Sequence, residues 1–263
     1  MRKYIIIGLF LAVNIAFAAY NPPPSTFPKM VQVPEAVANM NLGITGGSVP
    51  TVGGSSPPTY ANSGSGYVAA NISVACSAMA TTSTNAIVVF TGNGNTQTVT
   101  GVADTALNSY VKIAGVWSPS GDYRNEAWLA QNITGDGTNV ITVTFSDTAA
   151  DGICIAAEYS GVATSSAHDS DYAPSVVADD SSSPFTSGSD STTVDNDVVV
   201  GFIYNMTTTD TYSNGTTGTY RHDLIDVWVI VDKTAASAGA HTIDVAGTAS
   251  VNHAIMAVAL KPQ

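Results

Sequence analysis

Short apolar or alternating segments, separated by turn signals, fill the chain from Tyr67 onward. Residues 141–145 alternate aliphatic or aromatic side chains with threonine, whereas residues 153–157 form a continuous apolar run. Alternation predicts a strand with one face in solvent, and a continuous run predicts a strand covered on both faces. No stretch of ten or more residues keeps the 3.6-residue period of a helix. The pattern therefore predicts an all-β protein.

Turn signals recur about every 8–12 residues, which is typical of a sandwich or a barrel. The expected strands are residues 68–76, 86–90, 98–102, 110–117, 124–131, 140–145, 153–159, 198–204, 225–232, 242–245 and 254–260. We predict an antiparallel two-sheet β-sandwich of the jelly-roll type. Its expected core comprises Val74, Ile87, Val89, Ile113, Trp128, Val143, Phe145, Ile155, Val199, Trp228, Val229 and Met256.

A weak internal repeat accompanies the strand pattern. Residues 83–89 resemble residues 194–200, and Glu126-Ala127-Trp128 resembles residues 226–228. In both places a turn, a Thr/Val strand and an apolar strand follow in the same order. Either the domain has two pseudo-repeated halves, which suits a double Greek-key jelly roll, or short strands of simple composition match by chance.

The first 18 residues have the pattern of a signal peptide. A short basic segment at residues 1–4 precedes an apolar stretch at residues 5–16, which is too short to span a membrane comfortably. Ala16-Phe17-Ala18 is a small-x-small cleavage site. We expect cleavage before Ala19, no remaining membrane span, and a secreted or cell-surface location; an uncleaved anchor is the alternative.

Proline, glycine and serine dominate the segment after the signal peptide. This composition predicts an extended lead-in or linker over residues 19–66, followed by the sandwich domain over residues 67–263.

Composition and charge narrow the classes of function. Charged residues make up only 11% of the chain, and the formal net charge is −12. No local cluster of lysine and arginine offsets this acidity, so the chain would repel the phosphates of nucleic acids. We therefore exclude nucleic acid as a partner.

Both cysteines, Cys76 and Cys154, fall within expected strands. In an oxidising compartment they can pair in a disulfide, but two separate buried thiols fit the sequence as well. Two cysteines alone do not form a zinc site.

One string resembles a known family of domains. Glu158-Tyr159-Ser160-Gly161-Val162, followed by residues 164–169, resembles the midpoint motif of a jelly-roll β-sandwich module. That module occurs in secreted bacterial surface and phage proteins, often beside Ig-like or fibronectin-like repeats. This chain has Ala167-His168 where the family usually has Pro-Leu. The resemblance implies an accessory, surface-exposed module and no catalytic residue.

Residues suited to catalysis are scarce. After the signal peptide the chain has three glutamates, of which Glu126 and Glu158 could form a carboxylate pair, and four scattered histidines. No nucleophile elbow or phosphate-binding loop occurs. We predict that the protein is not an enzyme; a partly buried Glu126–Glu158 pair about 5–10 Å apart would contradict this prediction.

Calcium is the ion that the sequence best accommodates. Asp169, Asp171, Asp179 and Asp180 lie in a loop-rich stretch, with a further acidic point at residues 195–197. Carboxylates from two loops suit a hard cation. Solvated turn residues would give the same pattern, because aspartate is frequent in turns.

Aromatic residues at strand ends are the candidates for glycan binding. Trp117 and Tyr123 flank the turn at residues 118–122, and Tyr212 and Tyr220 flank the Asn214-Gly215 loop. Aromatic side chains at strand ends also pack on the rim of a core.

Two functions of different classes remain. The first is a secreted non-catalytic module that binds a glycan or a cell-surface partner. The alternative is a structural or adhesive component of a cell surface or virus particle, without a small-ligand site.

Overall fold

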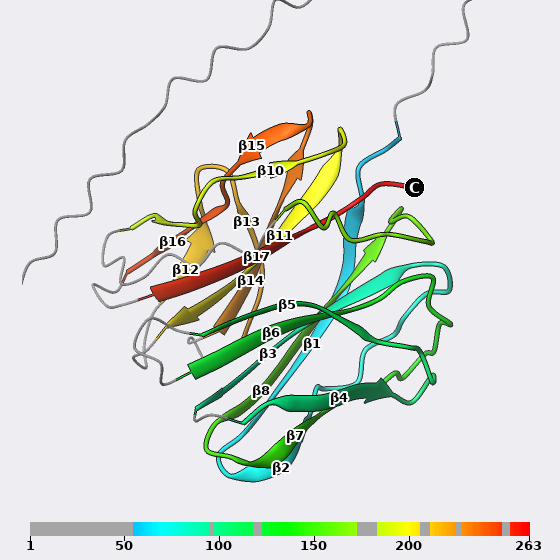
Figure 1. Ribbon diagram of the computed structural model, residues 1–263, viewed down its shortest axis with the longest axis vertical. Coiled ribbons are helices and arrows are strands. Elements are labelled where there is room, and N and C mark those ends of the chain that lie inside the picture. The colour runs from blue at the N-terminus through cyan, green and yellow to red at the C-terminus, as the bar shows by residue number, and fades with distance from the viewer. Residues whose placement is uncertain are drawn as a thin grey trace, which may run out of the picture. The chain divides into compact units, whose positions relative to one another are not determined.

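The computed structural model describes residues 55–94, 97–117, 123–172, 183–205, 211–224, 228–248 and 253–263. All of them belong to one compact unit, Val52–Gln263. The expected signal peptide and residues 19–54 of the expected lead-in lie outside these ranges, as do the side chains at positions 116, 117, 123, 205, 253 and 254. The described residues form strands and loops, with no helix (Figure 1).

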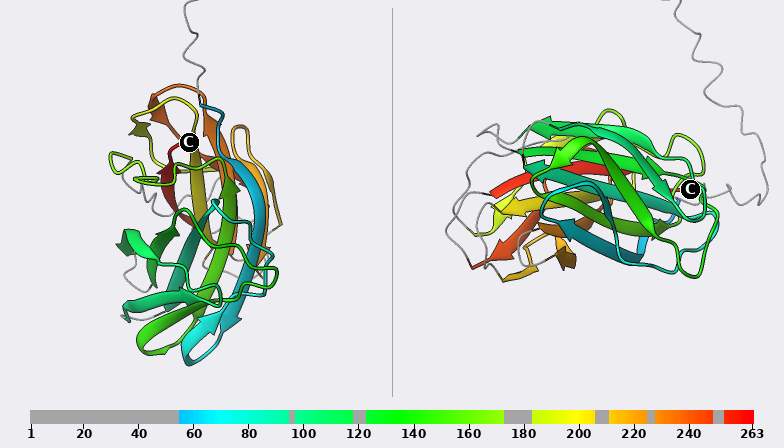
Figure 2. Two further views of the ribbon diagram at one scale, coloured as in Figure 1. Left: turned by 90° about the vertical axis from the view of Figure 1, so that its right-hand side faces the viewer. Right: turned by 90° about the horizontal axis from the view of Figure 1, so that it is seen from below.

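Two antiparallel sheets form the centre of the fold (Figures 1 and 2). The five-stranded sheet has the order β1 (Thr59–Val68), β8 (Gly152–Ser160), β3 (Ala86–Gly94), β6 (Tyr123–Ala130) and β5 (Val111–Trp117). The four-stranded sheet has the order β13 (Thr219–Leu224), β14 (Trp228–Ala235), β11 (Asp197–Asn205) and β17 (His253–Leu260).

Smaller sheets complete the fold. One three-stranded sheet contains β2 (Asn71–Ala75), β7 (Ile141–Ala149) and β4 (Val99–Asp104). Another contains β12 (Tyr212–Asn214), β16 (Asp244–Gly247) and β9 (Phe185–Thr186). A two-stranded sheet pairs β10 (Asp190–Thr192) with β15 (Gly239–His241).

Three apolar clusters lie between these layers. The first joins the inner faces of the two central sheets, where Phe90 of β3 stacks on Phe202 of β11 with ring centroids 5.3 Å apart. The second packs the five-stranded sheet against β2, β7 and β4, and the third packs the four-stranded sheet against β9 and β16. Along β3, Val88 faces the first cluster and Val89 faces the second. A strand that is covered on both faces needs apolar side chains at every position, which explains the continuous apolar runs in the sequence.

The predicted all-β sandwich is confirmed, and the jelly-roll connectivity stays a prediction. The outer sheets were not predicted. Ten of the twelve expected core residues are buried, whereas Ile113 and Trp128 are only partly buried.

The expected boundary at residue 66 is wrong, because β1 begins at Thr59 and pairs with β8 along its whole length. The Ser63-Gly64-Ser65-Gly66 string suggested a linker, but it is a strand crossed closely by another segment. A Cβ atom on Gly64 would lie 2.6 Å from the Ser77 carbonyl oxygen, and one on Gly66 would lie 1.9 Å from that of Ala75. Glycine permits this approach.

The two halves of the domain share one strand order. The central β3 lies between β6 and β8, as β11 lies between β14 and β17. Trp128 and Trp228 therefore occupy matching strands, β6 and β14. However, Trp128 pairs with Val89, the fourth residue of β3, and Trp228 pairs with Tyr204, the eighth residue of β11. The strands correspond, but an alignment of the two tryptophans is wrong.

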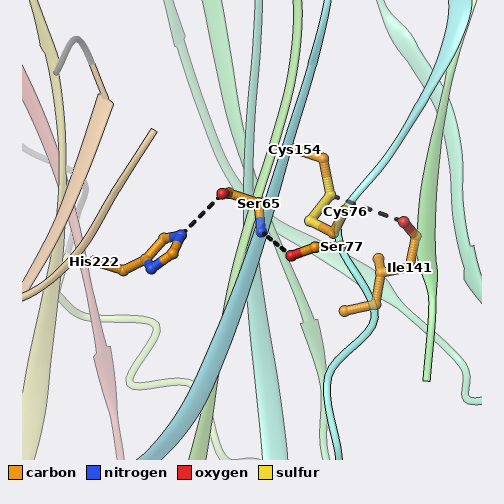
Figure 3. The surroundings of a disulfide bond; sticks show 6 residues. All are labelled: Ser65, Cys76, Ser77, Ile141, Cys154 and His222. Carbon is orange, nitrogen blue, oxygen red and sulfur yellow. Dashed lines mark hydrogen bonds between the residues drawn. A yellow bond between two sulfur atoms is a disulfide. The ribbon is translucent and has the colours of Figure 1, made fainter. Parts of the chain in front are cut away.

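A disulfide joins Cys76 to Cys154 (Figure 3). Cys76 directly follows β2 and Cys154 lies on β8, so the bond ties an outer sheet to a central one across the second apolar cluster. Nearby, His222 Nε2 on β13 lies 2.8 Å from Ser65 Oγ on β1, and this contact links the edge strands of the two central sheets (Figure 3). Of the two arrangements that the sequence allowed for the cysteines, the structure has the paired one.

Candidate functional site

The segment at residues 161–169, called here the midpoint loop, follows β8 and runs beside the last strand. Four backbone hydrogen bonds fix it there, one of them from the Gln263 amide to the Gly161 carbonyl. The Ala163 amide donates to the Lys261 carbonyl, the Lys261 amide to the Ala167 carbonyl, and the Asp169 amide to the Ala259 carbonyl. The string that resembled a family motif therefore ends in a loop held against β17.

A pocket of about 590 Å³ opens on one side of the midpoint loop. Its lining includes the polar residues Ser165, Ser166, Thr193, Asn196 and Lys261, together with apolar surface. Hydroxyl, amide and ammonium groups of this kind can hydrogen-bond a polar ligand.

A second pocket, of about 530 Å³, is lined by residues 166–168 of the loop. Val111, Ile113 and Leu129 give it an apolar wall, with Gln131 and His168 at its polar side. Gln131 Oε1 accepts a hydrogen bond from the Ala167 amide, so this wall also positions the loop. Ser166 lines both pockets, and its φ of 50° is in the left-handed region, which non-glycine residues seldom adopt.

Two buried carboxyl groups lie at the end of the midpoint loop, that of Asp169 within the loop and that of Asp197 next to it. Asp169 is 1% exposed and Asp197 is fully buried at the start of β11. Asp169 Oδ2 accepts hydrogen bonds from the Thr193 amide at 2.6 Å and the Thr193 hydroxyl at 2.8 Å. Lys261 Nζ lies 3.8 Å from Asp169 Oδ1.

The two carboxyl groups differ in protonation. Burial, and then the adjacent Asp169, raises the pKa of Asp197 to about 8. Burial also opposes ionisation of Asp169, but the interactions with Thr193, Asp197 and the Asp171 amide together outweigh it, and the pKa of Asp169 is lowered. Both oxygens of the buried Asp197 carboxyl lack a hydrogen-bond donor among the described residues, so this group can be satisfied by keeping a proton beside Asp169. At neutral pH the pair therefore holds one proton and one negative charge.

The residues expected to bind calcium are only partly described. Asp179 and Asp180 lie outside the described residues. The Asp171 amide donates a hydrogen bond to Asp169 Oδ1 at 3.4 Å. This contact is made by the backbone of Asp171 and does not involve its carboxylate. Within the described ranges, no group of three or more His, Cys, Asp or Glu side chains is arranged to hold a metal ion. Calcium binding stays a prediction, and what the fold brings to Asp169 is Asp197 and Lys261.

The aromatic residues expected to bind a glycan differ in how far the structure describes them. Tyr212 and Tyr220 are half-buried and pack against the third apolar cluster. Trp117 and Tyr123 end β5 and begin β6, but their side chains lie outside the description. Sequence reasoning missed Tyr67, which is 38% exposed and stacks on Trp228 with ring centroids 5.7 Å apart. It escaped notice because residues 63–66 before it suggested a linker, whereas Tyr67 lies near the end of β1, just before the bend at residues 69–70.

The two glutamates do not form a catalytic pair. Glu126 lies opposite Thr91 on β3, and Glu158 lies opposite Ile87 on the other side of the same strand. Four residues along β3 and two strand spacings separate them by roughly 16 Å. Each is buried with its own partners: Arg124 and Lys112 contact Glu126, and the Thr82 amide and Asn85 side chain donate to Glu158. This geometry differs from that of a glycosidase.

No family model, curated protein or solved structure matches the chain. Across the part of the chain that the structure describes, no helix is long and apolar enough to cross a membrane.

Proposed function

We propose that this chain is a secreted, non-catalytic structural component of a cell surface or particle. The observation that carries the proposal is the layered interior: three apolar clusters stacked through four sheets, with a disulfide between two of the layers. Such a unit resists unfolding and cleavage, as an exposed spacer must. The disulfide also favours an oxidising compartment, in agreement with the expected signal peptide.

The polar surface supports the same role. On β7 the buried residues alternate with the half-buried or exposed Thr142, Thr144 and Ser146. Uncharged hydroxyl side chains of this kind cover a sheet without creating an apolar patch that would aggregate.

Export is tested by the mass and N-terminal sequence of the protein recovered outside the producing cell. We expect an N-terminus at Ala19. Recovery of the protein with residues 1–18 still attached, in the membrane fraction, would contradict secretion.

A second candidate function is the binding of a polar ligand such as a glycan, and the pocket beside the midpoint loop favours it. Ser165, Thr193, Asn196 and Lys261 present hydrogen-bonding groups there. By contrast, the half-buried Tyr212 and Tyr220 leave little free ring surface for a sugar.

A glycan array separates the two functions. It compares the wild-type protein with Asn196→Ala in the pocket and Tyr212→Ala outside it. The structural role predicts no saturable binding by any of the three proteins. Saturable binding by the wild type that Asn196→Ala abolishes and Tyr212→Ala preserves would replace the structural role with the ligand-binding one.

A further inference from the structure

An amine, a carboxyl group and a second, proton-carrying carboxyl group meet at the end of the midpoint loop. Lys261 Nζ lies 3.8 Å from Asp169 Oδ1, and the adjacent Asp197 carboxyl is fully buried with no hydrogen-bond donor on either oxygen among the described residues. Backbone hydrogen bonds hold both reacting residues, because the Lys261 amide donates to Ala167 and the Asp169 amide donates to Ala259. The fold therefore holds the backbones of both residues side by side, within reach of the Lys261 side chain.

We propose that Lys261 and Asp169 become joined by an intramolecular amide bond, with Asp197 as the proton-transferring acid. The product links the loop after β8 to the residue that follows β17. The proposal rests on these contacts and does not require the structural role proposed above.

The reaction is a condensation without oxidation or reduction. The Lys261 amine, after losing its proton, attacks Asp169 Cγ and forms the C–N bond. The Cγ–Oδ1 bond then breaks, and the oxygen leaves as water. In total, one ammonium and one carboxylate become one amide and one water molecule. No further reactant is needed.

Thr193 is placed to stabilise the transition state of amine attack. Its amide and its hydroxyl both donate to Asp169 Oδ2, at 2.6 and 2.8 Å. Two donors on one oxygen would stabilise the negative charge that develops there when the amine attacks. Oδ2 then remains as the amide carbonyl, and Oδ1, which faces Lys261, is the oxygen that leaves.

Asp197 and the open pocket supply the proton transfers. Asp197 is fully buried and holds a proton against Asp169, so it can protonate the departing oxygen and recover a proton from the amine. The Lys261 side chain is 29% exposed and lines the 590 Å³ pocket, so its ammonium can lose a proton to solvent and the released water can escape. Holding the groups in contact replaces a bimolecular encounter with an intramolecular one.

The test is the mass of the purified full-length secreted protein after complete reduction and denaturation. We expect a mass lower than that of the mature sequence by one water, about 18 Da. Proteolysis should release a branched peptide that contains both Asp169 and Lys261. A wild-type protein of full sequence mass after prolonged incubation at pH 8 would overturn the proposal.

Three controls keep the result specific. Lys261→Arg preserves the positive charge but removes the amine, so it should have the full mass. Asp197→Asn preserves the shape but removes the acid, so water loss should be abolished or much slower, whereas Asp195→Asn in the same turn should react as the wild type does.

Asp136-Gly137 and Asp151-Gly152 can also lose water, by forming a succinimide. A water-loss product that hydroxylamine converts to a hydroxamate, or that maps to either of these pairs, would refute the amide.

Discussion

Removal of the Cys76–Cys154 disulfide should cost a large part of the protein's stability. The bond closes a loop with a sequence separation of 78 residues. The loss of chain entropy in the unfolded state then corresponds to about 4.5 kcal/mol, as an upper value, since disulfides commonly contribute about 2–4 kcal/mol. Both cysteines are buried, so substitution by alanine also removes packing from the second apolar cluster. Reduction without substitution isolates the cross-link from the packing.

The assay is urea unfolding followed by fluorescence, in the Lys261→Arg background so that only one cross-link varies. We expect the reduced protein to lose about 2–4 kcal/mol of unfolding free energy, and the Cys76→Ala/Cys154→Ala double variant to lose more. A loss below about 1 kcal/mol on reduction would show that the loop is already restricted in the unfolded state. The argument from chain entropy would then be refuted.

Three further perturbations test the packing and the buried carboxyl pair. Gly66→Ala should destabilise the fold by about 1–3 kcal/mol because its Cβ would overlap the Ala75 carbonyl. Gly101→Ala is the control, because a Cβ there would have nothing within 4 Å, and it should change the free energy of unfolding by less than about 1 kcal/mol. Equal effects of the two substitutions would refute the close crossing of β1 by residues 75–77. Trp228→Ala should lower the free energy of unfolding by about 3–5 kcal/mol, measured by thermal or urea unfolding. Trp128→Ala should lower it clearly less, because Trp128 is only partly buried. The reverse order would contradict the burial of the two side chains. In the Lys261→Arg background, the free energy of unfolding should fall as pH rises from about 4 to about 8, because folded Asp197, with its pKa near 8, keeps a proton that the unfolded chain releases. Asp197→Asn should flatten this slope, and an unchanged pH profile would show that the carboxyl pair does not share a proton.

The sequence predicted those strands whose own pattern carries the signal. Residues 141–145 alternate and residues 153–157 are continuously apolar, and both lie in strands. It missed β13, whose six residues are all half-buried, because the order Thr-Tyr-Arg-His-Asp-Leu has no apolar alternation. That strand is held by contacts distant in the sequence, including the Arg221–Asp232 ion pair and the His222–Ser65 hydrogen bond.

Short strands were missed for another reason. β9, β10, β12 and β15 contain two or three residues each, too few for any period to show. Their pairing depends on the sheets that they cover. Similarly, the glycine–serine composition of β1 is explained only by the segment that crosses it, at residues 75–77.

The candidate site was predicted in part. Asp169 was chosen as an ion ligand because of its acidic neighbours in sequence, and the turn at residues 195–197 was noted as a further acidic point. The sequence could not show that Asp197 contacts Asp169, because β17 and the midpoint loop must first assemble beside β11. Lys261 follows the last expected strand, and its contact with Asp169 could not be predicted because it depends on the same assembly.

The division of the domain into two halves has a consequence for synthesis and transport. Every strand of the five-stranded sheet, and of the small sheet of β2, β7 and β4, lies between residues 59 and 160, as do both cysteines. In a chain that emerges from its N-terminus, this half can pair its strands and oxidise its thiols before residues 185–260 arrive. The later half lacks this independence, because β11 has β17, the final strand, as a neighbour. Newly made protein should therefore pass through a stage in which the inner face of the first half, including Phe90, is uncovered and available to a chaperone.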